Sequence, residues 1–384
     1  MASSKKNIKL IHTVPSINNR SAGPSYSILK ICENLQFKNY DLKLATLDFK
    51  NDYPSFHIGF KKSFGPSVIG NSPNMKKWLM NEAMNNQTLI HTHSLWMMPN
   101  IYPSFVKKNI KNTKVIISPR GTLSEWSLKR SSHKKYLFSL FFQNKALRLA
   151  DIFHATADNE YDDIRRLGFK QPIAIIPNGV ELKINNLNNK NKKNIILFLS
   201  RIHPKKGIKE LLYSWQNVIK SNSNWYLEIV GPDNEGYLEK MKNLSIKLNL
   251  KNISFLGPLF DKNKEKKFLE SKLFVLPSHS ENFGMVIAEA LSYGLPVITT
   301  KNTPWNILTK KNAGECIDLS INNLTKSILK HINKSDEELK IMGENSIYWM
   351  KKDYNWKEVT HKFTLLYDWI LDKNLPTPNF IIKN

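Results

Sequence analysis

The sequence has little cysteine and lacks long apolar runs. Only two of its 384 residues are cysteine, Cys32 and Cys316, and each lies among apolar neighbours. Two isolated cysteines exclude a disulfide framework and a cysteine metal site, and indicate reduced core residues of a cytoplasmic protein. No window of about 18 apolar residues occurs and the first residues lack a cleavage signature. We therefore expect no membrane-spanning helix and no export.

Acidic residues are also scarce relative to basic ones. Lys and Arg total 57 and Asp and Glu total 32, which gives a formal net charge of +25. A basic surface attracts nucleic acid, anionic lipid head groups and phosphorylated substrates alike. A Lys- and Asn-rich composition can produce the same charge without a function, so the charge does not choose a partner.

Short apolar runs alternate with helical patterns in the first half of the chain. One helical segment has Ile28, Ile31, Cys32 and Leu35 on one face. Strands are predicted at 8–14, 42–47, 88–92, 114–118, 152–156 and 172–176. This alternation predicts a parallel sheet covered by helices.

A polar segment at 181–194 predicts a linker, because its Asn- and Lys-rich composition cannot form a core. A second series then predicts strands at 195–200, 225–230, 253–256, 273–276 and 296–299, with helices at 208–219 and 285–293. The fold prediction is α/β, with two doubly wound domains, 1–180 and 195–355, that face each other across a ligand cleft.

The end of the chain predicts one more amphipathic helix, at 356–371. We expect the segment 356–384 to pack back on the first domain. The tail beyond the helix contains Pro376 and Pro378 and is expected to be irregular.

A basic turn follows the predicted strand at 195–200. Arg201 projects from the carboxyl end of this strand, and Lys206 with Gly207 opens the next helix. The Arg fork and the Lys point charge could together neutralise a diphosphate without a metal. A solvated basic turn is the alternative.

A polar loop and a helix start follow the predicted strand at 273–276. Glu281 lies in the loop, Gly284 precedes the helix and Glu289 lies in it. The helix N-terminus favours an anion, and glycine allows close approach of a ligand to the backbone. Carboxylates suit hydroxyl groups of a sugar or ribose. A capping or a surface glutamate is the alternative.

These features resemble retaining glycosyltransferases of the GT-B fold, and are most similar to glycosyltransferase family four. The resemblance rests on the Glu-x7-Glu pattern of Glu281 and Glu289 and on the pair Arg201 and Lys206. Further matching segments are Ala22-Gly23-Pro24, Ser118-Pro119-Arg120-Gly121, Pro177-Asn178-Gly179 and Thr303-Pro304-Trp305. The segment around Arg120 is similar to members that build bacterial surface polysaccharides.

The resemblance implies a role for each matching residue and two Rossmann-like domains. Arg201 and Lys206 would hold the donor diphosphate, Glu281 the donor sugar and Glu289 the ribose. The residues that would lie against the donor through their backbone are Gly23, Gly257, Phe283, Gly284, Met285 and Val286. Ala22 stands where a second glycine is common, which weakens the assignment of Gly23.

His93, at the end of the predicted strand 88–92, resembles the family's active-site histidine, which contacts the donor sugar. A buried, hydrogen-bonded histidine is the alternative. We expect His91 to point to the opposite face of the strand. The pair could also ligate a metal, but no third ligand follows at a suitable spacing. Arg120 is a candidate for binding an acceptor phosphate, and Trp96 and Trp126 for stacking on sugar rings.

The segment 133–149 is basic and carries Tyr136, Leu137, Leu140, Phe141 and Phe142. It predicts either a helix on a membrane surface or a core helix with a basic edge.

The predicted function is retaining transfer of a hexose or N-acetylhexosamine from a nucleotide sugar, with UDP favoured over GDP-mannose. The predicted catalytic residues are Glu281, His93, Arg201 and Lys206. The predicted acceptor is a glycan or an undecaprenyl-diphosphate-linked oligosaccharide of lipopolysaccharide, O-antigen or capsule synthesis. No cofactor or metal is expected, since no Asp-x-Asp triplet occurs. The anionic face of the inner membrane is a candidate partner.

Two rivals remain at this point. A nucleotide-sugar epimerase or hydrolase would keep the fold and change the reaction. A nucleic-acid-binding protein would use the basic surface, although the basic residues match no recognised module.

Overall fold

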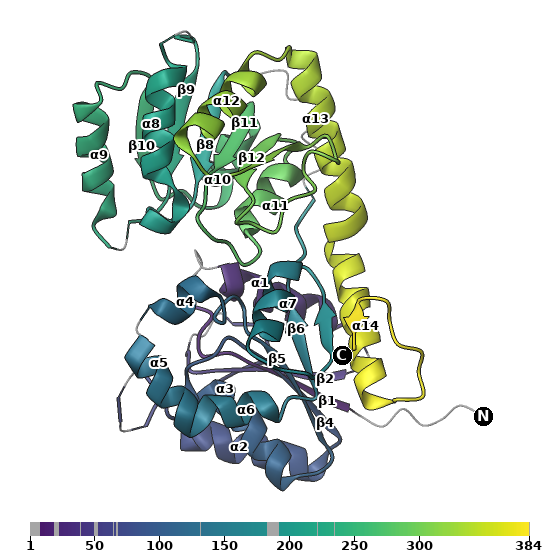
Figure 1. Ribbon diagram of the computed structural model, residues 1–384. Helices are drawn as coiled ribbons and strands as arrows, with labels where there is room; N and C mark the ends of the chain where they lie inside the picture. Colours follow the sequence, from purple (N-terminus) through teal and green to yellow (C-terminus); the bar gives the residue numbers. More distant parts are fainter. Residues whose placement is uncertain are drawn as a thin grey trace. The chain divides into compact units, whose positions relative to one another are not determined.

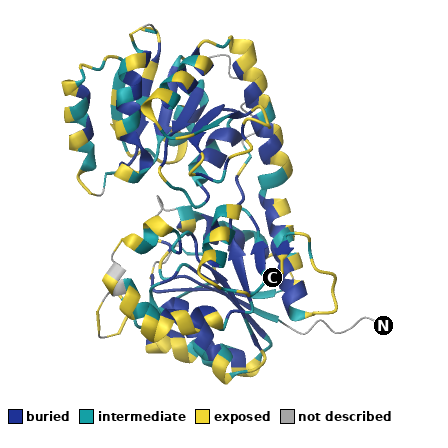
Figure 2. Cartoon of the chain, viewed as in Figure 1, coloured by how far each residue is buried: buried dark blue, intermediate teal, exposed yellow. Residues whose placement is uncertain are grey.

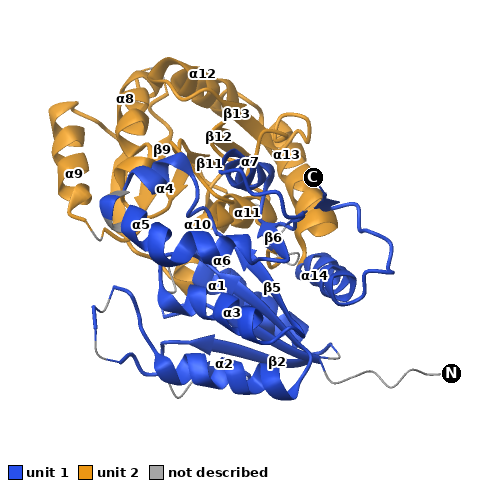
Figure 3. Cartoon of the chain, turned by 60° about the horizontal axis from the view of Figure 1, so that its bottom comes forward, with its two compact units in different colours: residues 1–178, 356–384 blue, residues 179–355 orange. Residues whose placement is uncertain are grey.

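The computed structural model describes residues 8–18, 23–38, 40–49, 53–63, 65–66, 68–130, 132–182, 192–220, 222–233 and 235–383. The chain divides into two compact units (Figure 3). Unit 1 comprises residues 1–178 and 356–384, and unit 2 comprises residues 179–355. Ala22 and most of the predicted linker, 183–191, lie outside the described residues. Each unit is described by itself.

Unit 1 is built on an eight-stranded sheet in the order β14-β7-β6-β5-β4-β1-β2-β3 (Figure 1). All neighbouring strands run parallel except β14, which is antiparallel to β7. The strands are β1 (Ile8–Thr13), β2 (Tyr40–Thr46), β3 (His57–Gly59), β4 (Thr88–His93), β5 (Thr113–Ser118), β6 (Ile152–Ala155), β7 (Ile173–Ile175) and β14 (Ile381–Ile382).

Helices cover both faces of this sheet. Helix α1 (Gly23–Leu35) and helix α14 (Trp356–Leu371) pack together over one face, with Ile28, Phe363 and Tyr367 in the same core as Leu10 and Leu89 of the strands. The other face carries two further clusters of apolar residues. The remaining helices are α2 (Pro73–Asn85), α3 (Met98–Asn109), α4 (Glu125–Lys129), α5 (Ser132–Phe138), the π-helical turn Ser139–Gln143, α6 (Asn144–Arg148) and α7 (Asp158–Arg166).

Unit 2 contains a six-stranded, fully parallel sheet in the order β10-β9-β8-β11-β12-β13. Its strands are β8 (Ile195–Leu199), β9 (Tyr226–Val230), β10 (Ile253–Gly257), β11 (Leu273–Leu276), β12 (Val297–Thr300) and β13 (Gly314–Ile317). Its helices are α8 (Ile208–Val218), α9 (Tyr237–Lys247), α10 (Asp261–Glu270), α11 (Met285–Ser292), α12 (Ile321–Ile332) and α13 (Asp336–Trp349), with a 3-10 turn at Pro204–Lys206 and a π-helical turn at Met350–Tyr354.

The predicted α/β class with two Rossmann-like domains is confirmed by the two parallel sheets. Three short strands, β3, β13 and β14, were not predicted. The tail is irregular around Pro376 and Pro378 as expected, and only its end differs, because Ile381 and Ile382 pair with β7. Cys32 is buried as expected, but Cys316 is only partly buried and its thiol donates to Asn306 Oδ1 at 3.2 Å.

The described residues contain no helix whose length and apolar character would let it cross a bilayer.

Candidate active site

The basic turn and the glutamate loop of unit 2 follow two neighbouring strands. Strand β8 ends before Arg201, and strand β11, its neighbour in the sheet, ends before the loop that carries Glu281. Parallel strands place their carboxyl ends at one edge of the sheet, which is where ligands of doubly wound folds bind. Two segments about 80 residues apart in sequence therefore meet at this edge.

Lys206 and Glu281 form an ion pair at the centre of this meeting point. The Lys206 Nζ contacts Glu281 Oε1, and both side chains are largely buried, with 10% and 11% exposed. Ser278 Oγ donates to the same carboxylate oxygen at 2.6 Å. Burial alone would favour the neutral acid, but the Lys206 charge and the two hydrogen bonds outweigh it and lower the pKa of Glu281. Glu281 is thus held ionised.

Gly207 allows the basic turn and the glutamate loop to touch. It has a φ of 70°, and a Cβ added there would lie 1.9 Å from the carbonyl oxygen of Pro277. The main chain of Lys205 joins the same loop, because its carbonyl accepts from His279 N–H at 2.8 Å. Only glycine fits this position without displacing one segment.

Helix α11 begins immediately after the glutamate loop. Its N-cap is Gly284, with a φ of 79°. The buried Trp305 donates from Nε1 to the carbonyl of Phe283 at 2.6 Å and so fixes the residue before the cap. The first N–H groups of a helix have no intrahelical acceptor, so those of Met285 and Val286 are available to an anion.

The remaining predicted donor residues of unit 2 lie around the same edge. Arg201 is exposed, and Gly257 ends β10 with a φ of 69°. Glu289, in the second turn of α11, is ion-paired with Lys264 of α10 at 2.7 Å. The structure thus brings Arg201, Lys206, Glu281 and the start of α11 together, with Glu289 on the same helix.

Sequence reasoning missed three residues of this site. Ser278 and Lys264 contact Glu281 and Glu289, as given above. Lys205 is the third: burial, together with the charges of Lys206 and Arg201, lowers its pKa to about 8 despite the opposing effect of Glu281. The adjacent lysines in the basic turn were the signal for Lys205.

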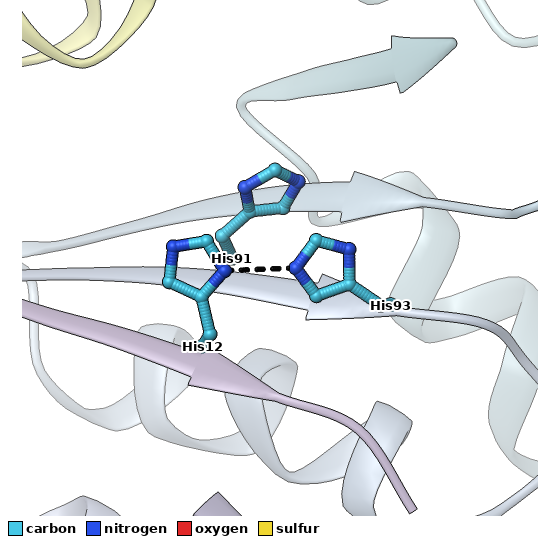
Figure 4. Close-up of side chains that lie close together, drawn as sticks. All are labelled: His12, His91 and His93. Carbon is cyan, nitrogen blue, oxygen red and sulfur yellow. Dashed lines mark hydrogen bonds between the residues drawn. The ribbon is translucent and has the colours of Figure 1, made fainter. Parts of the chain in front are cut away.

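In unit 1, His93 lies fully buried at the end of β4 and close to two other histidines (Figure 4). The rings of His91 and His93 have centroids 4.2 Å apart. The expectation that His91 points to the opposite face was wrong, because side chains two residues apart on a strand share a face. His12 joins them from β1, whose register pairs it with His91.

One chain of hydrogen bonds determines the protonation of these rings. Arg120, which can only donate, lies with Nη2 3.2 Å from His93 Nδ1, so this nitrogen accepts. His93 Nε2–H then donates to His12 Nδ1 at 2.9 Å. His12 Nε2–H in turn donates to the Tyr367 hydroxyl at 3.3 Å, and that hydroxyl donates to His91 Nδ1 at 2.9 Å.

The histidines of this network are neutral. Burial, and the nearby charge of Arg120 with it, lowers the pKa of His12 to about 3 and holds the pKa of His91 and His93 well below 6.5. Arg120 also donates from Nη1 to Asn178 Oδ1 at 2.7 Å. Both ring nitrogens of His93 are thus engaged within unit 1.

The three histidines also have the spacing of a metal site. Their ring nitrogens lie within 4.8 Å of one another, so the expectation that no third ligand joins His91 and His93 was wrong. The fixed charge of Arg120, 3.2 Å from His93, opposes a cation there. The hydrogen-bonded network therefore accounts for the cluster better than metal ligation does.

The other predicted residues of unit 1 are less tightly grouped. Gly23 begins α1. Trp96 has a φ of 74°, which is uncommon for a residue with a side chain, and its N–H donates to Gln143. Trp126 is 38% exposed on α4. The donor contact of Gly23 and the stacking of Trp96 and Trp126 on sugar rings stay predictions.

Two family models match the chain, one for each half. The model described as Glycosyltransferase Family 4 matches residues 22–184, and the model described as Glycosyl transferases group 1 matches residues 180–349. The parallel-sheet units and these matches define a glycosyltransferase of the GT-B fold. The chain belongs to the family-four type of glycosyltransferase, which confirms the family and the fold that the sequence predicted.

Similar proteins agree with this assignment. An uncharacterized glycosyltransferase of Methanocaldococcus jannaschii is 25% identical over 79% of this chain and 86% of its own. The crystal structure of Anabaena HepE in complex with UDP and glucose has a TM-score of 0.73 at 15% identity, and covers 94% of this chain and 99% of its own. WaaG, a glycosyltransferase involved in lipopolysaccharide biosynthesis, has a TM-score of 0.68 at 15% identity, with 93% and 99% covered.

Proposed function

We propose that the protein transfers a hexose or N-acetylhexosamine, with retention of anomeric configuration, from a nucleotide sugar. The observation that carries this proposal is the buried Lys206–Glu281–Ser278 cluster beside Arg201 and the start of α11. It combines cations for a diphosphate with a carboxylate for sugar hydroxyls. The UDP held by HepE favours a UDP-sugar as donor, with GDP-mannose as the alternative.

In the proposed reaction, this site must stabilise the nucleoside diphosphate as it leaves the sugar. As the glycosidic bond to the diphosphate breaks, negative charge grows on the phosphate oxygens. Lys206, held by Glu281, and the N–H groups of α11 are fixed beforehand and oppose that charge without reorganising, and the exposed Arg201 adds a second cation. Glu289 binds the ribose hydroxyls, and Lys264 holds it in place. In this proposal no metal or other cofactor takes part.

The proposed acceptor is a lipid-linked oligosaccharide or a lipopolysaccharide, O-antigen or capsule precursor at the cytoplasmic face of the inner membrane. WaaG, of similar fold, is a lipopolysaccharide enzyme and supports this choice. Arg120 is the candidate for an acceptor phosphate, because it is buried and has neutral partners in His93 and Asn178.

The test is a donor panel followed by a product assay. Thermal shifts with UDP- and GDP-sugars, in buffer with EDTA, identify the donor, and transfer to lipid extracts is then measured. Glu281→Ala and Arg201→Ala should each lower transfer at least about tenfold, or about 1.4 kcal/mol. Lys209→Ala, on the exposed side of α8, is the matched control.

Two results would contradict the proposal. If sugar transfer remained unchanged in both Glu281→Ala and Arg201→Ala, the assignment of the active site would be wrong. Release of free sugar or an epimer at the same rate with and without acceptor would favour the hydrolase or epimerase alternative.

A further inference from the structure

The helical segment from α5 through the π turn to α6 turns its apolar side chains outward. Tyr136 is 68% exposed, Leu137 56%, Leu140 54% and Phe141 60%. Figure 2 shows this stretch of unit 1 largely in the colour of exposed residues. Within about one and a half turns, four large apolar groups face water, which is far more than isolated surface residues require.

The inward side of the same segment is partly polar and partly apolar, because Gln143 is buried beside Ala146 and Leu147 of α6. Gln143 is fully buried, and its Oε1 accepts from the Trp96 N–H at 3.0 Å. Lys135 donates to the carbonyl of Ser127 and lies 5.8 Å from the Trp96 ring centre. Polar contacts and the buried Leu147 therefore attach the segment to unit 1, while Tyr136, Leu137, Leu140 and Phe141 remain on the outer side. The alternative of a core helix with a basic edge is wrong for these residues.

Cations predominate in the sequence that forms this face. Between Trp126 and Ala150 the sequence contains no Asp or Glu, while it contains Lys129, Arg130, Lys134, Lys135, Lys145 and Arg148. Lys129, Lys145 and Arg148 are exposed. An apolar strip flanked by cations complements a surface that offers hydrocarbon below anionic groups.

We propose that the face formed by Tyr136, Leu137, Leu140 and Phe141 docks on the surface of an anionic lipid bilayer. The positive charge beside this apolar strip favours a lipid bilayer over the two other candidate partners. A symmetric contact with a second copy would oppose identical cationic flanks, and a nucleic acid would leave the apolar strip in water. The inference extends the membrane part of the proposed function and does not depend on which sugar is transferred.

The experiment is co-sedimentation of the full chain with vesicles. Vesicles of phosphatidylcholine with phosphatidylglycerol should bind the protein, and those of phosphatidylcholine alone should bind it much less. Binding should fall as salt is raised. The double variant L137D/F141D should weaken binding at least about tenfold, or about 1.4 kcal/mol.

The controls separate docking from folding and from sugar transfer. Ile246→Asp changes an apolar residue that is 76% exposed on α9 of unit 2, and should bind vesicles normally. L137D/F141D should keep its melting temperature and its thermal shift with the donor. K145E/R148E should lower binding to anionic vesicles alone.

The proposal fails if L137D/F141D sediments with anionic vesicles as the parent does. It also fails if the unsubstituted protein does not bind vesicles but forms a dimer, and the L137D/F141D variant is a monomer. Failure of the sugar-transfer proposal would look different, because vesicle binding would persist while Glu281→Ala left transfer unchanged.

Discussion

At the scale of single residues, Lys206 and Glu281 form a largely buried ion pair in the candidate site of unit 2. Both side chains are about nine-tenths buried. Such buried ion pairs add little net stability, since the cost of desolvation offsets much of their attraction. Removal of one partner is nevertheless destabilising, because the other is left as a buried charge without a counter-charge. Stability alone therefore does not explain the pair, and its geometry fits the proposal that Lys206 holds an ammonium group for a diphosphate.

A double-mutant cycle at this pair should show strong coupling. Lys206→Met and Glu281→Gln should each lower the free energy of unfolding of unit 2 by about 1–3 kcal/mol, because each leaves a buried group without its counterpart. The double variant should lose less than the sum, by about 1 kcal/mol or more. Urea unfolding of the four proteins measures this, and simple additivity would contradict it.

Lys205 should make donor binding depend on pH. Its pKa is lowered to about 8 by burial and the neighbouring cations, and a bound diphosphate must raise that pKa. Affinity for UDP is then highest below pH 8 and falls as pH rises through 8, by at most about tenfold per pH unit.

The measurement for Lys205 is titration calorimetry in buffers of different ionisation enthalpy, where binding at pH 8 should take up protons. Lys205→Arg keeps its charge throughout this range. The uptake should therefore vanish in that variant, and its persistence would assign the proton to another group.

Local motifs predicted the residues of this site that adjoin each other in sequence. Arg201 with Lys206, and Glu281 with Gly284, each follow one strand, and this context together with the family resemblance indicated them. Lys264 and His12 could not be found in this way, because their partners Glu289 and His93 come from other elements. Such contacts depend on strand order and helix packing, which no short pattern contains.

At the scale of elements, the junction between the 3-10 turn and the loop after β11 depends on one glycine. Gly207 and Gly236 share a φ of 70° and each precedes a helix. They differ in surroundings, since a Cβ at Gly207 meets Pro277 O and one at Gly236 meets nothing within 4 Å.

Alanine at these two positions should separate backbone strain from steric clash. Gly236→Ala should cost about 1 kcal/mol, which is the strain of the left-handed conformation. Gly207→Ala should cost about 2–4 kcal/mol and abolish the thermal shift with the donor, because the basic turn must move away from Glu281. Equal losses in the two variants would contradict the close approach.

Element prediction failed where local and tertiary preferences differ. Strands β3 and β14 have three and two residues, too few for an alternating pattern, and exist because an existing strand edge offers partners. The segment 133–149 has correct helical periodicity, but periodicity alone does not say which face is buried. In the structure Tyr136, Leu137, Leu140 and Phe141 face outward, while Gln143 and Leu147 face inward.

At the scale of the whole molecule, α14 completes the core of unit 1 from the far end of the chain. Its residues Trp356, Val359, Phe363, Leu366 and Tyr367 belong to the same apolar cluster as β1 and α1. Apolar burial is worth about 1.5–3 kcal/mol for each large side chain, so unit 1 without α14 should not keep its fold.

A chain that ends at residue 355 tests this dependence. Unit 1 should lose its cooperative unfolding transition, while unit 2, whose core lacks residues from α14, should retain the thermal shift with the donor. A chain that ends at residue 375 loses only β14 and should unfold cooperatively at a lower urea concentration. Intact cooperative unfolding of both units in the shorter chain would contradict the role of α14.

The division of the chain has a consequence for its synthesis. Unit 2 is inserted into unit 1, and the residues that enter and leave it lie together, since Val180 bridges to Asn355. At about 5–20 residues per second, a ribosome needs roughly 10 s or more to pass from unit 1's first part to α14. During that interval the first part of unit 1 should expose the apolar face of its sheet that α14 later covers. Unit 1 is therefore synthesised first but should complete its folding last, and chaperones should bind it in the meantime.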